Sequence, residues 1–298
     1  MNKKLQSNIK RQGVAWVFVL PYLSVFFIFT ILPVLVSIFF SFTDFNMLQA
    51  PHFIGMGNYT RLFLQDDIFI KSIGNTFILA MVTGPLGYML CLLFAWFINE
   101  LRPMTRAIVT LIFYAPSISG NMALVWQAVF SGDAYGYLNG FLMNAGIISS
   151  PVIWLKDERY ILALVAIVAL WSSLGTSFLT FIAGFQGVDK SYYEAGAIDG
   201  IKNRWQELWY ITLPLMRPQM LLSAVLSITS AFGVGTIVTQ LAGFPSTNYA
   251  AHTIINHLQD YGTTRYELGY ASAIATILFL IMVLSNTVVR RLISKVGS

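Results

Sequence analysis

Residues 16–29 read WVFVLPYLSVFFIF and residues 161–170 read ILALVAIVAL. Neither run alternates apolar with polar residues, as the strands of a membrane barrel do. In hydrocarbon every backbone N–H and C=O group needs a partner within the protein, so a membrane-spanning segment is either a helix or part of a closed barrel. The two runs therefore predict membrane-spanning helices and an all-α fold.

The composition of the whole chain agrees with a lipid environment. Of its 298 residues 56% are hydrophobic and 10% are charged, and the mean hydropathy is +0.68. Soluble domains carry about 25% charged residues. The net charge of +5 can indicate nucleic acid, but here it comes from basic residues between the apolar runs, so no nucleic-acid partner is expected. The one cysteine, Cys91, lies in an apolar run and is expected to pack in the interior.

A helix needs about 20 apolar residues to cross a bilayer. The charge-free intervals provide six such segments, which hydropathy places near 15–41, 74–98, 107–130, 160–183, 218–240 and 269–289. The interval 134–155 is also uncharged, but its Gly, Asn, Ser and Pro residues favour an interfacial loop with a short helix. We expect a single transmembrane domain over residues 1–298, with about six spans surrounded by membrane lipid.

The basic residues predict the orientation of these spans. With the N-terminus inside, thirteen of the 18 Lys and Arg residues fall in cytoplasmic segments and five in outer loops. The positive-inside rule then places both termini in the cytoplasm. The N-terminus starts as a signal peptide would, with Lys3, Lys4, Lys10 and Arg11. Its apolar run is too long for one and lacks a clear cleavage site, so it is expected to stay as the first span.

The predicted spans hold neutral polar residues and no Asp, Glu, Lys or Arg. The three histidines, His52, His252 and His257, fall in outer loops. Ion-coupled carriers usually keep an ionisable group within the membrane, which argues against a proton-driven carrier. Hydroxyl, amide and indole groups suit an uncharged sugar, and the candidate substrate-binding residues are Asn121, Trp171, Ser173, Thr176, Ser227, Thr229 and Ser230. The alternative is that such residues only hold the helices together.

The loop between the fourth and fifth spans, residues 184–217, is longer than a connector needs to be. Ser191 and Glu194 have the spacing of a capping box, which predicts a helix from Tyr192 to Asp199. Gly200 is placed to end that helix in a left-handed conformation. A second amphipathic segment is expected over 201–210, before the proline at position 214 starts the fifth span.

The sequence EAGAIDG (194–200), followed ten residues later by ITLPL (211–215), resembles the EAA motif of permease subunits of binding-protein-dependent ATP-binding-cassette (ABC) importers. Five further segments are similar to carbohydrate-uptake permeases related to the larger pore subunit of the maltose transporter. These are GMGNYTRLF (55–63), NTF (75–77), YAPSISGNMALVWQAVF (114–130), LAGFP (241–245) and LGYASAIATILF (268–279). The resemblance covers about residues 14–290 and implies the type I importer permease fold, in a bacterial cytoplasmic membrane.

The resemblance also implies roles for the loop and a set of partners. Tyr193, Glu194, Ala195, Gly196, Asp199 and Gly200 would belong to a coupling helix that docks on a cytoplasmic ATPase. The partners would be a homologous second permease that completes a heterodimeric pore, two ATPase subunits, and an extracytoplasmic sugar-binding protein. ATP and magnesium would bind to the ATPase and not to this chain. Gly196 stands where the family commonly has alanine or serine, which weakens the helix by roughly 1 kcal/mol.

The sequence contains no GxxxxGK[ST] phosphate loop and no constellation of catalytic or metal-binding residues at membrane depth. We therefore expect no enzymatic activity in this chain and no metal. The expected function is ATP-driven uptake of a sugar, with a neutral oligosaccharide as the substrate. The alternatives are a stand-alone secondary carrier for a neutral polar solute, and a membrane scaffold or intramembrane enzyme.

Overall fold

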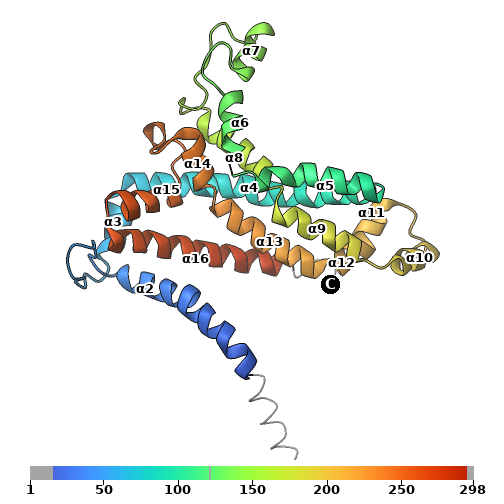
Figure 1. Ribbon diagram of the computed structural model, residues 1–298, viewed down its shortest axis with the longest axis horizontal. Helices are drawn as coiled ribbons and strands as arrows, with labels where there is room; N and C mark the ends of the chain where they lie inside the picture. Colours follow the sequence, from blue (N-terminus) through green and yellow to red (C-terminus); the bar gives the residue numbers. More distant parts are fainter. Residues whose placement is uncertain (1–15, 121, 294–298) are drawn as a thin grey trace, which may run out of the picture. The chain divides into compact units, whose positions relative to one another are not determined.

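The computed structural model describes residues 16–120 and 122–293, which are mostly helical (Figure 1). They form two compact units: the first contains residues up to 65 and 258–277, and the second contains 66–257 and 278 onwards. In chain order the helices are η1 (Phe27–Ile31), α2 (Leu32–Phe40), α3 (Gly57–Leu64), α4 (Asp67–Asn99), α5 (Pro103–Ile118), α6 (Met122–Val129), α7 (Tyr137–Asn144), α8 (Ile161–Ser172), α9 (Thr176–Gly187), α10 (Lys190–Ile198), α11 (Arg204–Glu207), η2 (Leu208–Thr212), α12 (Leu213–Leu215), α13 (Arg217–Phe232), α14 (Gly235–Ala242), η3 (Thr247–Tyr249), α15 (Ile254–Gln259), η4 (Asp260–Thr264) and α16 (Leu268–Ile293).

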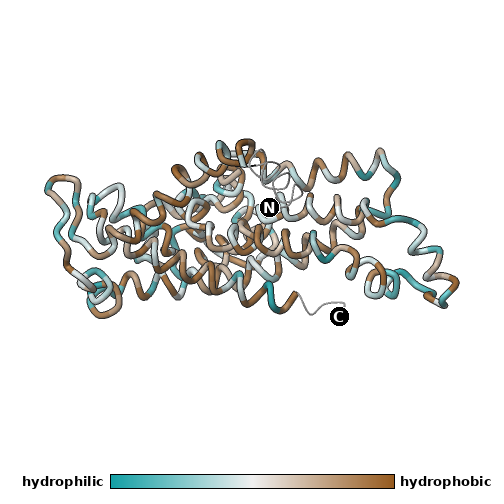
Figure 2. Tube along the Cα trace, turned by 90° about the horizontal axis from the view of Figure 1, so that it is seen from below, coloured by the Kyte–Doolittle hydropathy of each residue, from teal (hydrophilic) through white to brown (hydrophobic). Residues whose placement is uncertain are grey.

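The described chain contains five helical segments that can cross a membrane, and six if one bent pair of helices forms a single span. Five are long and apolar enough by themselves: Trp16–Phe40, Asp67–Asn99, Ile161–Gly187, Arg217–Ala242 and Leu268–Ile293. The sixth consists of α5 and α6, which meet at a bend of 88°. Apolar residues run along these helices and hydrophilic residues gather toward their ends (Figure 2). The predicted all-α fold with about six spans is confirmed, and the single domain and cytoplasmic termini stay predictions.

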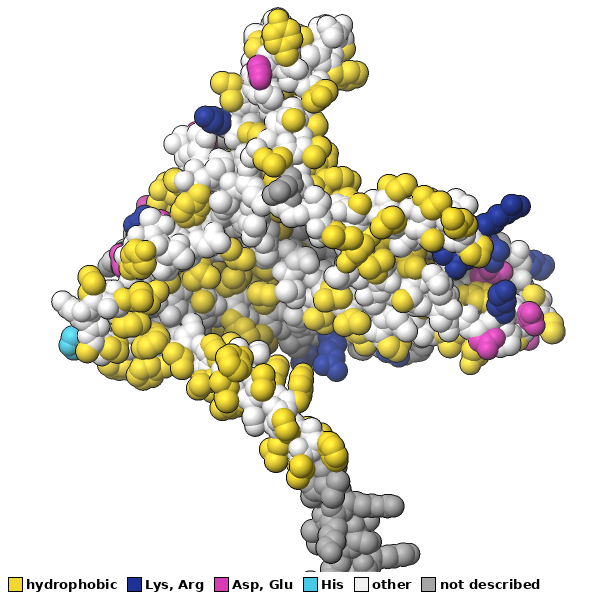
Figure 3. Space-filling view, in the orientation of Figure 1, with side chains coloured by type: hydrophobic (Ala, Val, Ile, Leu, Met, Phe, Trp, Pro, Cys, Tyr) yellow, Lys and Arg dark blue, Asp and Glu magenta, His cyan; other side chains and the backbone are white. Residues whose placement is uncertain are grey.

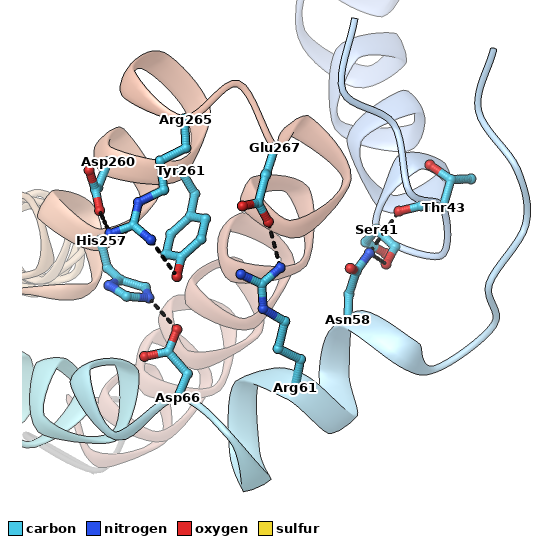
Figure 4. A network of polar contacts seen from close by, with 10 residues as sticks. All are labelled: Ser41, Thr43, Asn58, Arg61, Asp66, His257, Asp260, Tyr261, Arg265 and Glu267. Carbon is cyan, nitrogen blue, oxygen red and sulfur yellow. Dashed lines mark hydrogen bonds and ion pairs between the residues drawn. The ribbon is translucent and has the colours of Figure 1, made fainter. Parts of the chain in front are cut away.

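In the first unit, the segment GMGNYTRLF (55–63) holds the end of the first span (Figure 4). The buried amide of Asn58 on α3 donates hydrogen bonds to the carbonyls of Ser41 and Thr43, both at 2.8 Å. One turn further on, Arg61 forms an ion pair with Glu267 near the start of α16. The segment that resembles carbohydrate permeases thus joins the exit of the first span to the last helix.

In the second unit, α4 is the helix around which the others pack. Its buried face contacts α8, α9 and α13. Cys91 lies at the centre of this packing with a fully buried side chain, as the sequence predicts, and the largest buried neighbours are Phe178 and Phe181 of α9. Small residues on α4 allow this close approach; Gly87, for example, faces the side chain of Ser173.

Three of the predicted spans are interrupted rather than continuous. The third is broken between Ile118 and Met122, the fourth between Ser172 and Thr176, and the fifth between Phe232 and Gly235. The sequence predicted single helices through all three places. The first two breaks contain Ser and Gly residues, and the third contains Gly233. Glycine is a weak helix former and serine hydrogen-bonds locally to the backbone, so both favour an interruption.

The segment 131–154 is organised by one buried side chain. Asn139 of α7 donates hydrogen bonds to the carbonyls of Ser131, Asp133 and Val152. Its carbonyl oxygen accepts from the Val152 N–H and from the Trp154 indole at 2.8 Å. The short helix predicted in this interval is confirmed as α7, and Asn139 fixes it against the returning chain.

The substitution Asn139→Asp removes three donated hydrogen bonds from this segment. An unsatisfied buried group costs about 1–3 kcal/mol, so the segment should open locally while the spans stay folded. Hydrogen–deuterium exchange of the Val152 region should therefore accelerate. Asn144→Asp, at the exposed end of the same helix, is the control. Equal exchange in both variants would contradict the role given to Asn139.

Candidate functional site

Two of the helix breaks of the second unit, those near Ser173 and Gly233, meet the last turns of α5 at one polar cavity of about 370 Å³. Its walls come from α4, α5, the junction of α8 with α9, and the junction of α13 with α14. Hydroxyl groups dominate this lining, which contains Thr83, Tyr114, Ser117, Ser172, Ser173, Thr176, Ser177, Ser227 and Ser230. No Asp, Glu, Lys or Arg is among its described lining residues. A cavity of this kind can offer hydrogen bonds to an uncharged polar ligand.

Four of the residues singled out from the sequence line this cavity: Ser173, Thr176, Ser227 and Ser230. Two others lie elsewhere. Trp171 packs edge-to-face on Trp126 at 5.4 Å, with the two ring planes 80° apart. Thr229 is exposed and donates its hydroxyl to the carbonyl of Val225 in its own helix. Asn121 lies outside the described residues.

Part of the polarity near the cavity holds helices together. Ser177 of α9 and Ser223 of α13 donate to each other's backbone carbonyls, at 3.3 and 3.1 Å. Ser227 donates to the Ser177 hydroxyl at 3.1 Å. Such interhelical bonds contribute about 0.6 kcal/mol each on average in a membrane. The interpretation that polar residues hold the helices together therefore applies to Ser177 and Ser223, whereas sugar binding by the other hydroxyls stays a prediction.

Two lining residues, Thr83 and Tyr114, were missed by the sequence reasoning. Thr83 lies in the second span, which reads as apolar, and its hydroxyl donates to the carbonyl of Leu79. Its position seven residues after Thr76 places both threonines on one face of α4, and this helical spacing was the available signal. Tyr114 precedes the helix break in the third span and could have been grouped with Ser117 by the same rule.

At the far end of α9, the loop 184–217 contains the predicted helix, α10, but its N-terminal cap differs from the prediction. The cap is Asp189, whose carboxylate accepts a hydrogen bond from the Ser191 N–H at 2.9 Å. That bond lowers the pKa of Asp189. The Ser191–Glu194 capping box is therefore wrong, because the N–H that Glu194 would take is already bonded. Aspartate outcompetes serine here because it precedes the helix and carries a charge favoured at the N-terminus.

The end of α10 is as predicted. Gly200 has a φ of +92°, in the left-handed region. Its N–H donates to the carbonyl of Ala197, and the Ile201 N–H donates to the carbonyl of Gly196 at 2.9 Å. This pair of bonds is a Schellman motif, which satisfies the last carbonyls of the helix. Asp199 is the C-terminal cap residue.

Gly196 is a weak helix former, but its lack of a side chain allows close packing. A Cβ atom at this position would lie 2.6 Å from Cδ1 of Ile211 and 3.0 Å from Cδ1 of Ile201. Beside it, the Tyr193 hydroxyl is 2.9 Å from the hydroxyl of Thr212. One face of α10 thus rests on the segment 201–212. The other face stays exposed and includes Tyr192, Glu194, Ala195 and Ile198.

The segment 201–212 joins α10 to the end of α4. The amphipathic stretch predicted for 201–210 is observed as α11 and the π-helical turn η2. The guanidinium of Arg204 lies 2.7 Å from the carboxylate of Glu207 and 3.1 Å from that of Glu100. The hydrogen bond to Glu207 is the main reason that the pKa of Arg204 is raised, and the charge of Glu100 adds to it. The Trp205 ring packs on Trp96 of α4 at 4.6 Å. Lys and Arg side chains gather at this end of the second unit (Figure 3).

At its other end, α4 begins with a buried polar contact that the sequence did not indicate. Asp66 caps the helix by accepting from the Phe69 N–H, and its second oxygen lies 3.0 Å from Nε2 of His257 (Figure 4). His257 and His252 are 2% and 1% exposed, with rings 5.5 Å apart. Their position in an outer loop had suggested no such burial, because a loop has no periodic pattern from which burial can be read.

A multi-pass helical protein with broken spans around a hydroxyl-lined cavity, and an exposed helix at one end, has the architecture of a membrane permease. Residues 85–298 match the family described as binding-protein-dependent transport system inner membrane component, and the chain belongs to that family. It is thus a permease subunit of an ABC importer, embedded in a membrane, and not an enzyme.

Individual relatives match the sequence over nearly the whole chain. It is 30% identical over 94% of its length, and over 90% of the relative's, to the probable ABC transporter permease protein YesP of Bacillus subtilis. It is 29% identical over 97% of both chains to the trehalose/maltose transport system permease protein MalF of Thermococcus litoralis. It is also 28% identical over 90% of its length, and 89% of the relative's, to the lactose transport system permease protein LacF of Rhizobium radiobacter.

A solved structure is similar along the full fold. One chain from the crystal structure of a bacterial ABC transporter involved in the import of the acidic polysaccharide alginate matches with a TM-score of 0.75 and 25% identity. The match covers 97% of this chain and 99% of that one. The predicted membership of the importer permeases is therefore confirmed.

The corrected cap of α10 gives a prediction. Replacing Asp189 by alanine removes the acceptor for the Ser191 N–H and should destabilise the helix by about 1 kcal/mol. Hydrogen–deuterium exchange of the α10 amides should accelerate about fivefold, since 1.4 kcal/mol corresponds to tenfold. Ser191→Ala should leave that exchange nearly unchanged. A capping box would give the opposite ranking of the two variants.

Proposed function

We propose that this chain forms one half of the translocation pore of an ATP-driven, binding-protein-dependent sugar importer, and that its substrate is a neutral oligosaccharide. The observation that carries the proposal is the convergence of three broken spans on one hydroxyl-lined cavity. Irregular backbone at membrane depth is tolerated where it is buried in protein or lines a water-filled cavity. Discontinuous helices commonly form the substrate sites of transporters.

The sugar assignment is supported by the chemistry of the lining and by the relatives. Eight of the nine polar lining residues are serine or threonine with an alcohol hydroxyl, and hydroxyls can both donate to and accept from a sugar. The absence of a charged group from the described lining favours a neutral ligand. LacF and MalF are named for lactose and for trehalose or maltose, which are neutral disaccharides.

We further propose that α10 is the coupling helix, through which the ATPase acts on the spans. Tyr193 and Gly196 hold it to the segment 201–212, Asp199 and Gly200 end it, and Glu194 and Ala195 lie on its exposed face. Since Asp189 supplies the cap, Glu194 is left available for a basic residue of the partner. A short, rigid helix with one exposed face suits a groove on another protein.

In this proposal the complete transporter contains a homologous second permease, two ATPase subunits that bind ATP and magnesium, and an extracytoplasmic sugar-binding protein. The loaded binding protein docks on the outer loops, at 43–72, 131–159 and 241–268. ATP draws the two ATPases and their coupling helices together, so that the spans turn outward and the sugar enters the cavity. Hydrolysis then restores the inward-facing state.

The alternative of a stand-alone secondary carrier is weakened by the family membership and leaves α10 without a purpose. It makes a distinct prediction, which is uptake by proteoliposomes that contain this chain and no ATPase. The importer requires the ATPase and the binding protein for the same uptake.

Replacing Glu194 by alanine should uncouple the reconstituted complex. Loss of one partner from a desolvated charge pair costs about 2–5 kcal/mol, so stimulation of ATP hydrolysis by the loaded binding protein should fall by at least tenfold. The measurement is ATPase activity with a panel of oligosaccharides. Ser191→Ala, on the same helix, should keep the stimulation. Full stimulation in Glu194→Ala would remove this residue from the coupling contact.

Replacing Thr176 by valine tests the cavity. Loss of one neutral hydrogen bond to a sugar costs about 0.5–1.5 kcal/mol, so the apparent affinity for transport should fall roughly two- to tenfold. Uptake of labelled oligosaccharides into proteoliposomes measures this. Thr229→Val is the matched control, since Thr229 lies outside the cavity. Similar effects of the two substitutions would argue against this cavity as the sugar site.

A further inference from the structure

The second unit contains one long helix that remains continuous beside the three broken spans. α4 runs from Asp67 to Asn99 and passes through Pro85 without interruption. Its 33 residues correspond to a length of about 50 Å. Thr83, in its middle, lines the polar cavity. α4 therefore extends past the cavity in both directions, while the helices around it can bend there.

The outer end of α4 is bonded to the segment 248–257. Lys71 donates to the Asn248 carbonyl at 2.7 Å, and the Asn75 amide donates to the Tyr249 and His252 carbonyls, at 3.2 and 2.9 Å. The Thr76 hydroxyl accepts from the Ile254 N–H at 2.9 Å. Together with the Asp66–His257 contact, these bonds along the first turns of α4 make the outer segment move with the helix.

The opposite end of α4 is attached to the loop that carries α10. Trp96 packs on Trp205, and Glu100 pairs with Arg204. Behind this contact, Leu208 and Leu213 are buried in the same apolar cluster as Trp96. α10 rests on this segment through Gly196 and Tyr193. A continuous path of packed side chains thus leads from α10 to the end of α4.

We propose that α4 transmits movement between α10 and the outer segment 248–257, and that Trp96, Glu100, Arg204 and Trp205 are the positioning residues of this link. This inference rests on the proposed coupling role of α10. Packed elements shift as rigid bodies rather than deform continuously. A pull on α10 then reaches the outer segment through α4, and the broken spans take up the change at the cavity.

The Arg204–Glu100 pair can be used to test for a positioning role without a large change in stability. Its side chains are 64% and 43% exposed, and exposed ion pairs contribute little to stability. Disrupting it should leave folding and assembly intact. If disrupting this pair still changes how far the movement of α10 reaches, the cause is the lost contact between Arg204 and Glu100 and not a loss of stability.

The test uses two labels on the outer side of the second unit. Tyr135→Cys and Thr247→Cys place spin labels at exposed positions, and the native Cys91 is fully buried. The complex with its companion permease and ATPases is placed in nanodiscs, and the distance between labels is measured before and after adding ATP with orthovanadate. We expect a shift in the distance distribution for the otherwise unaltered chain.

Variants of the link should lose this shift while they still hydrolyse ATP. Trp205→Ala should abolish it, whereas Trp209→Ala should keep it. Trp209 is the matched control, since it is 63% exposed against 62% for Trp205 and its ring has no aromatic partner among the described residues. Arg204→Glu should also abolish the shift, and adding Glu100→Arg should restore most of it. Asn75→Ala, at the outer end, should give the same loss.

Each outcome bears on a different claim. A shift that survives in Trp205→Ala and Arg204→Glu, or that is absent from the unaltered chain while the complex hydrolyses ATP, overturns the role of α4. If the chain binds no ATPase, the proposed importer function itself fails. Loss of the shift in the link variants, with retained ATP hydrolysis and rescue by the charge exchange, supports the inference.

Discussion

The structure depends on the requirement that backbone polar groups be satisfied within a bilayer. Hydrocarbon offers no hydrogen bonds, so each span is a helix and an interruption needs other partners for the freed groups. The breaks near Ser173 and Gly233 meet this requirement together, because they line a common cavity with Tyr114 and Ser117 of α5. The cavity that we propose as the site for a polar ligand is thus also the place where two broken spans find partners for their freed backbone groups.

Polar side chains near the breaks divide between two uses. Ser177 and Ser223 donate hydrogen bonds to each other's backbone carbonyls and so join α9 to α13. Other side chains, such as those of Thr176 and Ser230, line the open space. A membrane interior supplies no hydrophobic force between helices, so bonds of the first kind and close packing must hold the cavity walls. The second kind can then serve a ligand without loosening the bundle.

The positions of the spans could be read from the sequence, because the charge-free intervals are long and the bilayer fixes their length. Helical spacing also places the hydroxyls of Ser227 and Ser230 on one face of α13. Thr229 does not line the cavity, because it lies on another face of α13. The cap at Asp189 and the burial of His257 could not be read in this way. Both depend on competition between nearby groups and on contacts distant in sequence.

The loop 184–217 is connected along the chain to two helices that line the cavity. α9 begins at the cavity with Thr176 and ends at Gly187, two residues before Asp189 caps α10. After Gly200 and the segment 201–212, the chain enters α13, which leads back to the cavity at Ser227 and Ser230. The loop is therefore inserted between two helices that both contribute to the lining. In the proposed coupling role, a displacement of α10 acts on both helices, and its contact with α4 carries the movement to the segment 248–257.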